Sequence, residues 1–65
     1  MRDYSRTEID AGIEEWILNE KHRAILKRRL IDRIGLERLA EEFDLSVSQI
    51  KRILRDEEAR LFRHI

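Results

Sequence analysis

The chain has 65 residues, a size at which one domain buries only about 60% of the surface that its unfolded chain exposes. Its 14 Lys and Arg residues balance its 14 Asp and Glu residues, and it contains no cysteine and no proline. The lack of cysteine excludes disulfides, thiol catalysis and cysteine-based zinc sites. We therefore expect a single domain, residues 1–65, in a reducing, cytoplasmic setting, with no membrane-spanning segment and no signal peptide.

The charges are unevenly distributed along this neutral chain. Residues 1–19 contain five acidic residues against Arg2 and Arg6, whereas residues 46–55 contain Lys51, Arg52 and Arg55 and no acid. A local basic face can exist within a neutral chain, and such a face attracts nucleic acid.

The first half of the chain predicts two helices. Residues 1–6 are expected to form a flexible polar arm, with Thr7 as the N-cap of the first helix. Asn19 is expected to end that helix and to cap the next one. Apolar residues of the first helix recur at a spacing that places them in one stripe along the helix: Ile9, Ile13, Trp16 and Ile17. Trp16 is therefore interpreted as a core residue.

The second helix is predicted over residues 20–33. Its apolar residues spread over more than one face, which is typical of a central helix with several neighbours. Gly35 is expected to end it with a positive φ. Lys27, Arg28 and Arg29 form a basic run whose members point in three directions, so one or two of them contact phosphate or all are simply solvent-exposed.

The second half predicts a short helix over residues 36–43 and a longer helix from Val47. Ser46 and Gln49 have the spacing of a capping box, which marks the start of the longer helix. We expect this helix to outrun the core near Glu57 and to pack again through its last residues. A separate short helix capped by residues 56–58 is the alternative.

Residues 36–55 predict a helix-turn-helix. This motif needs a small residue in its first helix, a turn residue that tolerates left-handed φ, and apolar residues that lock the helices together. Ala40 and Asp44 meet the first two needs, although glycine is more usual at the turn. Leu45 is the apolar residue after the turn, and the locking set is Leu39, Phe43, Val47, Ile50 and Ile53. The expected fold is an all-α, four-helix domain: an N-terminal helix, a tri-helical core and a long C-terminal recognition helix.

The outward face of the last helix predicts contacts with double-stranded DNA. A recognition helix enters the major groove with its N-terminal residues toward the base edges, where arginine pairs with guanine and glutamine with adenine. We expect Ser48, Gln49 and Arg52 to read bases. The residues expected to contact the DNA backbone are Ser46, Lys51, Arg55, Arg38, Lys27 and Arg28. A merely solvated polar face is the alternative.

Residues 20–65, above all "RAILKRRLIDRIGLERLAEEFDLSVSQIKRILRDEEARLF", resemble region four of bacterial sigma factors and small phage and prophage regulators that carry this region alone. The resemblance implies a DNA-binding transcriptional regulator, in a bacterial cell or a phage-infected host, that can also contact RNA polymerase. The chain departs from the family pattern at Gly35, Arg38 and Asp44, where threonine or serine, glutamate and glycine are usual. It also lacks the region that melts promoters, so a stand-alone sigma factor is not expected.

Other functions have less support in the sequence. His22 and His64 lack metal-ligand spacing and are expected at the surface, and no glycine-rich phosphate loop is present, so we expect no enzyme, cofactor or metal. The serious alternative is a protein-interaction module that binds RNA polymerase or another protein, which the neutral charge and the acidic first helix favour. We also predict a homodimer, because paired modules read two half-sites. The expected partner surface is Trp16, Leu61, Phe62 and Ile65.

Overall fold

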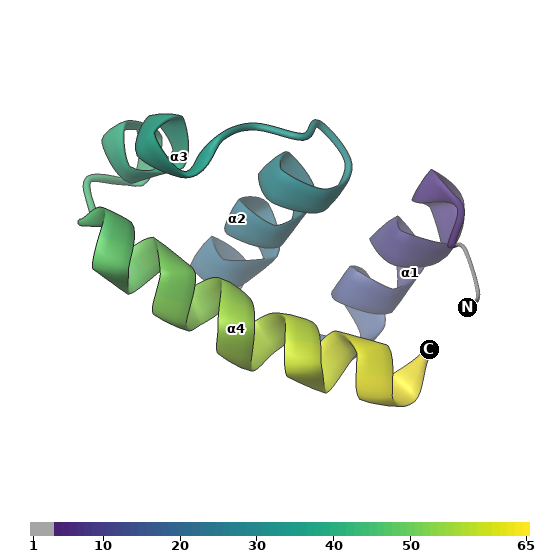
Figure 1. The fold of residues 1–65 in the computed structure, drawn as a ribbon. Helices are drawn as coiled ribbons and strands as arrows, with labels where there is room; N and C mark the ends of the chain where they lie inside the picture. Colours follow the sequence, from purple (N-terminus) through teal and green to yellow (C-terminus); the bar gives the residue numbers. More distant parts are fainter. Residues whose placement is uncertain (1–3) are drawn as a thin grey trace.

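A computed structural model describes residues 4–65 and contains four helices. They are α1 (Arg6–Trp16), α2 (Glu20–Leu30), α3 (Leu36–Phe43) and α4 (Val47–His64), with no strand in this part of the chain. The predicted all-α, four-helix class is confirmed. Helix α4 runs along one edge of the molecule, and the other three helices lie on the same side of it (Figure 1). The opposite face of α4 is therefore left open along its length.

The start of α1 differs from the prediction. The N-cap is Ser5 and not Thr7, because Ser5 and Glu8 form a capping box: the Ser5 Oγ accepts from the Glu8 N–H (3.1 Å), and the Glu8 carboxylate accepts from the Ser5 N–H (3.2 Å). The ring of Tyr4 packs on that of Phe62, with centroids 5.4 Å apart. The flexible arm is thus wrong for residues 4–6, and the rest of it lies outside the described residues.

The boundaries of α2 are set by local backbone geometry. The Asn19 side chain accepts from the His22 N–H (3.0 Å), which confirms the predicted cap. The helix ends at Leu30 instead of residue 33, and the Ile34 N–H donates to the Arg28 carbonyl (3.0 Å). The left-handed residue of this connection is Arg33, with φ 58°, and not Gly35, whose φ is −70° because it serves as the extended N-cap of α3.

The turn between α3 and α4 forms as the sequence predicts. Asp44 adopts the left-handed conformation, with φ 55° and ψ 47°, and the Leu45 N–H donates to the Ala40 carbonyl (3.0 Å). Ser46 and Gln49 form the predicted capping box. The locking side chains belong to the core or pack against it, so α3 and α4 are held together through the residues that the motif requires.

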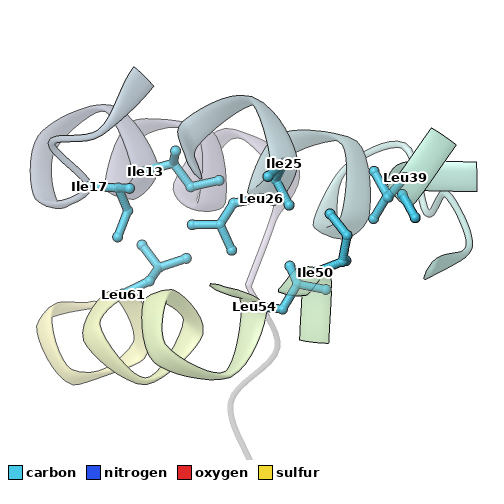
Figure 2. Close-up of a cluster of buried hydrophobic side chains, with 9 residues drawn as sticks. Ile13, Ile17, Ile25, Leu26, Leu39, Ile50, Leu54 and Leu61 are labelled. Carbon is cyan, nitrogen blue, oxygen red and sulfur yellow. The ribbon is translucent and has the colours of Figure 1, made fainter. Parts of the chain in front are cut away.

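The core draws on all four helices, with α4 supplying residues along its whole length (Figure 2). Helix α4 continues without interruption to His64, which confirms the single long helix. The buried apolar residues are Ile13, Ile17, Ile25, Leu26, Leu39, Ala40, Ile50, Leu54 and Leu61.

Helix α4 does not outrun the core at Glu57, and that prediction is wrong. Glu57 is only 5% exposed, and its Oε2 lies 2.8 Å from the Nδ1 of His22 on α2. The expected surface position of His22 is also wrong, since this side chain is half-buried beside Glu57. A buried carboxylate is retained on an apolar stripe where a hydrogen-bonding partner meets it, and His22 is that partner.

Helices α1 and α4 approach closely at Gly12. A Cβ atom on this residue would lie 2.9 Å from the side chains of both Leu61 and Ile65, closer than real Cβ atoms come to other atoms. The missing side chain therefore allows the end of α4 to pack directly on α1 and to bury Leu61 completely.

Candidate nucleic-acid interface

The first three turns of α4 present an exposed polar face. Ser48, Lys51, Arg52 and Arg55 are all exposed and line one open hollow, while Ile50 on the opposite side of the helix is fully buried. No residue that lines this hollow is acidic. The structure thus brings together two of the predicted base readers, Ser48 and Arg52, and two of the predicted backbone contacts, Lys51 and Arg55.

Hydrogen bonds at the start of α4 change what two of the predicted site residues can offer. The Ser46 Oγ accepts from the Gln49 N–H (3.1 Å), and the Gln49 Oε1 accepts from the Ser46 N–H (2.9 Å). The Gln49 side chain is therefore turned back to the helix start, with its amide oxygen occupied. It can donate from its NH₂ group, but it cannot make the two-bond pairing with adenine without opening the capping box.

A second hollow joins three helices beside the first. It is lined by Arg29 from α2, Arg38 from α3 and Lys51 from α4, together with Gly35, Leu36, Glu37 and Val47. Lys51 belongs to both hollows, so the basic surface is continuous from the α2–α3 connection to the outer face of α4. Glu37 is the acidic residue of this lining.

Arg29 is a member of this surface that sequence reasoning did not select. Its Nη1 donates to the Ile34 carbonyl (3.0 Å), which fixes the guanidinium at the end of α2 beside α3. The helical period alone places Arg29 on the same side of α2 as the buried Leu26. Arg29 nevertheless borders a hollow, because of the path of the α2–α3 connection. That connection could not be read from the spacing of the residues.

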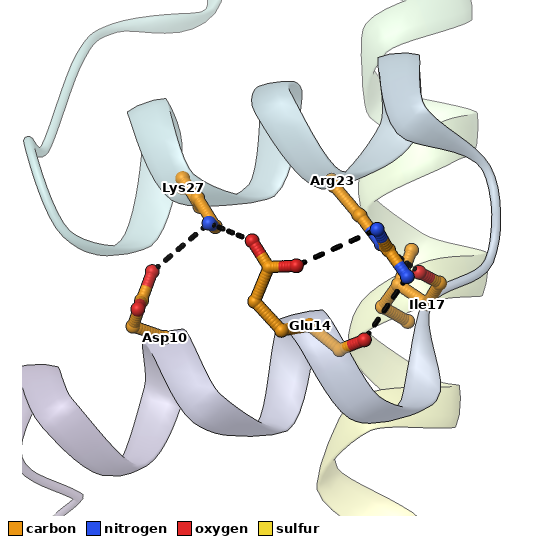
Figure 3. A network of polar contacts seen from close by, with 5 residues as sticks. All are labelled: Asp10, Glu14, Ile17, Arg23 and Lys27. Atoms are coloured by element: carbon orange, nitrogen blue, oxygen red, sulfur yellow. Dashed lines mark hydrogen bonds and ion pairs between the residues drawn. The ribbon is translucent and has the colours of Figure 1, made fainter.

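Lys27, by contrast, is held by acidic residues of α1 (Figure 3). Its Nζ lies 3.1 Å from the Asp10 carboxylate and bonds to Glu14, which also pairs with Arg23 (3.4 Å). The hydrogen bond from Lys27 lowers the pKa of Glu14, and the bond to Glu14 raises the pKa of Lys27. Lys27 therefore faces α1 and its charge is offset there, so it does not join the two hollows as a free cation.

Arg28 is engaged in the same way between α2 and α3. Its guanidinium bonds to both oxygens of Glu42 and to Asp32 (3.1 Å). These bonds raise the pKa of Arg28, and the bond from Arg28 lowers the pKa of Glu42. Lys27 and Arg28, which the sequence predicts to contact the DNA backbone, are thus each paired with a carboxylate of a neighbouring helix.

Ion pairs on the remaining predicted contacts are few and exposed. The Arg55 Nε lies 3.2 Å from the Asp56 carboxylate, and the Arg38 Nε lies 3.8 Å from that of Glu42, with both arginine side chains at least 70% exposed. Exposed pairs of this kind contribute little to stability. Both arginines can therefore exchange these partners for a phosphate at little cost.

The predicted partner surface is divided by the packing of α4 on α1. Leu61 is fully buried within the chain, so its assignment to a partner surface is wrong. Ile65 is half-buried, and the ring of Trp16 stacks on that of His64 with centroids 4.0 Å apart. Phe62 stays 39% exposed, and Leu18, which the sequence did not single out, is 78% exposed in the α1–α2 connection.

The described residues contain no group of three or more His, Asp or Glu side chains placed to hold a metal ion. None of the four helices has the length and apolar character needed to cross a membrane. No family model, curated protein or solved structure matches the chain.

Proposed function

We propose that this protein is a sequence-specific, double-stranded DNA-binding transcriptional regulator that places the first turns of α4 in the major groove. The observation that carries the proposal is the exposed face of Ser48, Lys51, Arg52 and Arg55. It contains no acid and lies on the second of two helices joined by a left-handed turn at Asp44. This arrangement suits a helix that reads base edges from its N-terminal half.

Within this proposal, some of these residues contact bases and others contact phosphates. Arg52 and Ser48 face outward beyond the capping box and read bases, and Gln49 contributes at most its NH₂ group. Lys51 and Arg55 lie beside these base readers and contact phosphates. Arg38, a predicted backbone contact, and Arg29 extend the same backbone contact around the second hollow, whereas Lys27 and Arg28 are paired with carboxylates of neighbouring helices.

The resemblance of residues 20–65 to sigma region four supports transcription as the setting, in the cytoplasm of a bacterial cell or a phage-infected host. We further propose that the protein acts as a homodimer, because paired modules bind two half-sites, whereas a single copy binds only one. Sedimentation equilibrium tests the dimer directly. A monomer at high concentration contradicts it and leaves single-copy DNA binding to be tested on its own.

A salt titration of binding to random duplex DNA tests the proposal. The logarithm of the affinity should fall linearly with the logarithm of the salt concentration, with a slope of about −0.9 for each phosphate contacted. Selection of bound sequences from a random duplex pool then identifies the site. No measurable affinity at low salt would overturn the proposal and would favour the protein-interaction module that binds RNA polymerase or another protein.

Arg52→Ala tests the role of the outer face of α4. If Arg52 reads a base, the variant should lose about 1–3 kcal/mol of binding free energy on the selected site and relax the preference at one position. Lys21→Ala is the matched control, since it removes one positive charge from an exposed position on α2 outside both hollows. An equal loss in both variants would mean that net charge, and not a contact of Arg52, decides binding.

A further inference from the structure

The exposed face of α4 continues well past the helix-turn-helix. The residues Ser48, Arg52, Arg55, Ala59 and Arg63, which we call the outer stripe, follow one another at intervals of three or four residues, so they share one side of the helix. All five are exposed, and the buried residues of α4 lie on the other side. No other helix of residues 4–65 covers this side of α4 (Figure 1).

The length of α4 places the end of the outer stripe outside the groove. At a rise of 1.5 Å per residue, Arg63 lies about 16 Å beyond Arg52 along the helix axis. The major groove is about 12 Å wide and curves around the duplex, whereas α4 is a single continuous helix. When Arg52 reads a base, the last turns of α4 therefore extend beyond the width of the groove, where the sugar–phosphate backbone is the part of the duplex nearest to them.

The chemistry of these last turns suits a phosphate. Asp56 borders the stripe where the helix leaves the groove, beside Arg55 (3.2 Å), but none of the five residues of the outer stripe is acidic. Ala59 follows with a side chain small enough to allow the backbone to approach. Arg63 then offers an exposed guanidinium that forms no ion pair within residues 4–65, whereas the neighbouring Arg60 lies 3.7 Å from Glu57.

We propose that Arg63 binds a DNA phosphate at the rim of the major groove, with Ala59 as the point of closest approach, so that α4 contacts DNA over its whole length. This inference rests on the proposed DNA-binding function. It adds a contact with the DNA backbone outside residues 36–55. Without DNA, the positive charge of Arg63 in the last turn of α4 only complements the negative end of the helix dipole.

Two substitutions test the contact, measured as duplex affinity and its salt slope. Arg63→Ala should lower the affinity about eightfold at about 0.1 M salt, the factor that corresponds to 0.9 counterion, and should reduce the slope by about 0.9. Ala59→Glu should weaken binding more than Ala59→Gln, which has the same size without the charge. Lys21→Ala, an exposed cation on α2, should leave both quantities near those of the unmodified protein.

The outcomes separate this inference from the proposed function. Unchanged affinity and slope in Arg63→Ala, in a protein whose Arg52→Ala variant binds weakly, overturn the rim contact alone. Equal effects of Ala59→Glu and Ala59→Gln, or of Arg63→Ala and Lys21→Ala, overturn it as well. Absence of DNA binding by the unmodified protein overturns the proposed function and the rim contact together. Circular dichroism of each variant verifies that α4 is intact.

Discussion

Replacing His22 by alanine removes the hydrogen-bonding partner of a carboxylate in the contact between α2 and α4. The His22 Nδ1 lies 2.8 Å from the Glu57 Oε2, and the two side chains are 30% and 7% exposed. A hydrogen bond to a charged group contributes about 1.5–3 kcal/mol, and breaking a fully buried ion pair costs about 3–5 kcal/mol. Because the imidazole is partly exposed, water can enter the space that it leaves, so we expect a loss of about 2 kcal/mol.

Urea unfolding followed by circular dichroism measures this loss. With a slope of about 1 kcal/mol/M for so small a chain, the midpoint should fall by about 2 M. The control is the same His22→Ala substitution made in a Glu57→Leu variant, in which an apolar side chain replaces the carboxylate. In that variant His22→Ala should cost little stability, because no carboxylate is left without its partner. A loss below about 0.5 kcal/mol in the unmodified protein, or an equal loss in both backgrounds, would refute the role given to this pair.

Two further predictions concern the contacts of α1 and of α3 with their neighbours. Gly12→Val should destabilise the fold by about 2 kcal/mol, because the added atoms collide with the packed end of α4. Gly12→Ala should cost less, since alanine favours the helix over glycine by about 1 kcal/mol. Thermal unfolding of both variants checks which of them is the less stable. The pKa values of Glu14 and Glu42 are held below the ordinary value of 4.5, chiefly by hydrogen bonds from Lys27 and Arg28. Their contribution to stability is therefore present above pH 4.5 and is lost as the pH falls through the lower folded-state values, so the free energy of unfolding should decline below pH 4.5, and less steeply in a Glu14→Gln, Glu42→Gln variant.

The parts of the structure that sequence reasoning predicted well depend on residues close together in the chain. The Ser46 capping box and the left-handed Asp44 need only a few neighbouring residues, and the apolar spacing of α3 and α4 determines which sides meet. The N-cap of α1 is a local feature that the sequence analysis assigned to the wrong residue: Ser5, and not Thr7, has glutamate at the third position after it and closes the box.

The parts that it missed depend on which helices meet. Glu57 breaks an apolar stripe, and the sequence gives no sign that His22, 35 positions earlier, lies against it. In the sequence, the three cations of the basic run on α2 likewise cannot be told apart. Only the packing of α1 and α3 on α2 decides that Lys27 and Arg28 meet carboxylates while Arg29 borders a hollow.

The same packing explains how a chain of zero net charge presents a basic face. Asp10 and Glu14 offset Lys27, and Glu42 offsets Arg28, so these acids lie where α1 and α3 meet α2 and leave the first turns of α4 to its own cations. Exposed pairs of this kind add little stability, but they determine where the positive charge remains available. Phosphate contacts depend on that local charge and not on the total. Neutralising Glu14 would therefore raise the net charge without adding a cation to the outer stripe, because Lys27 would still face α1.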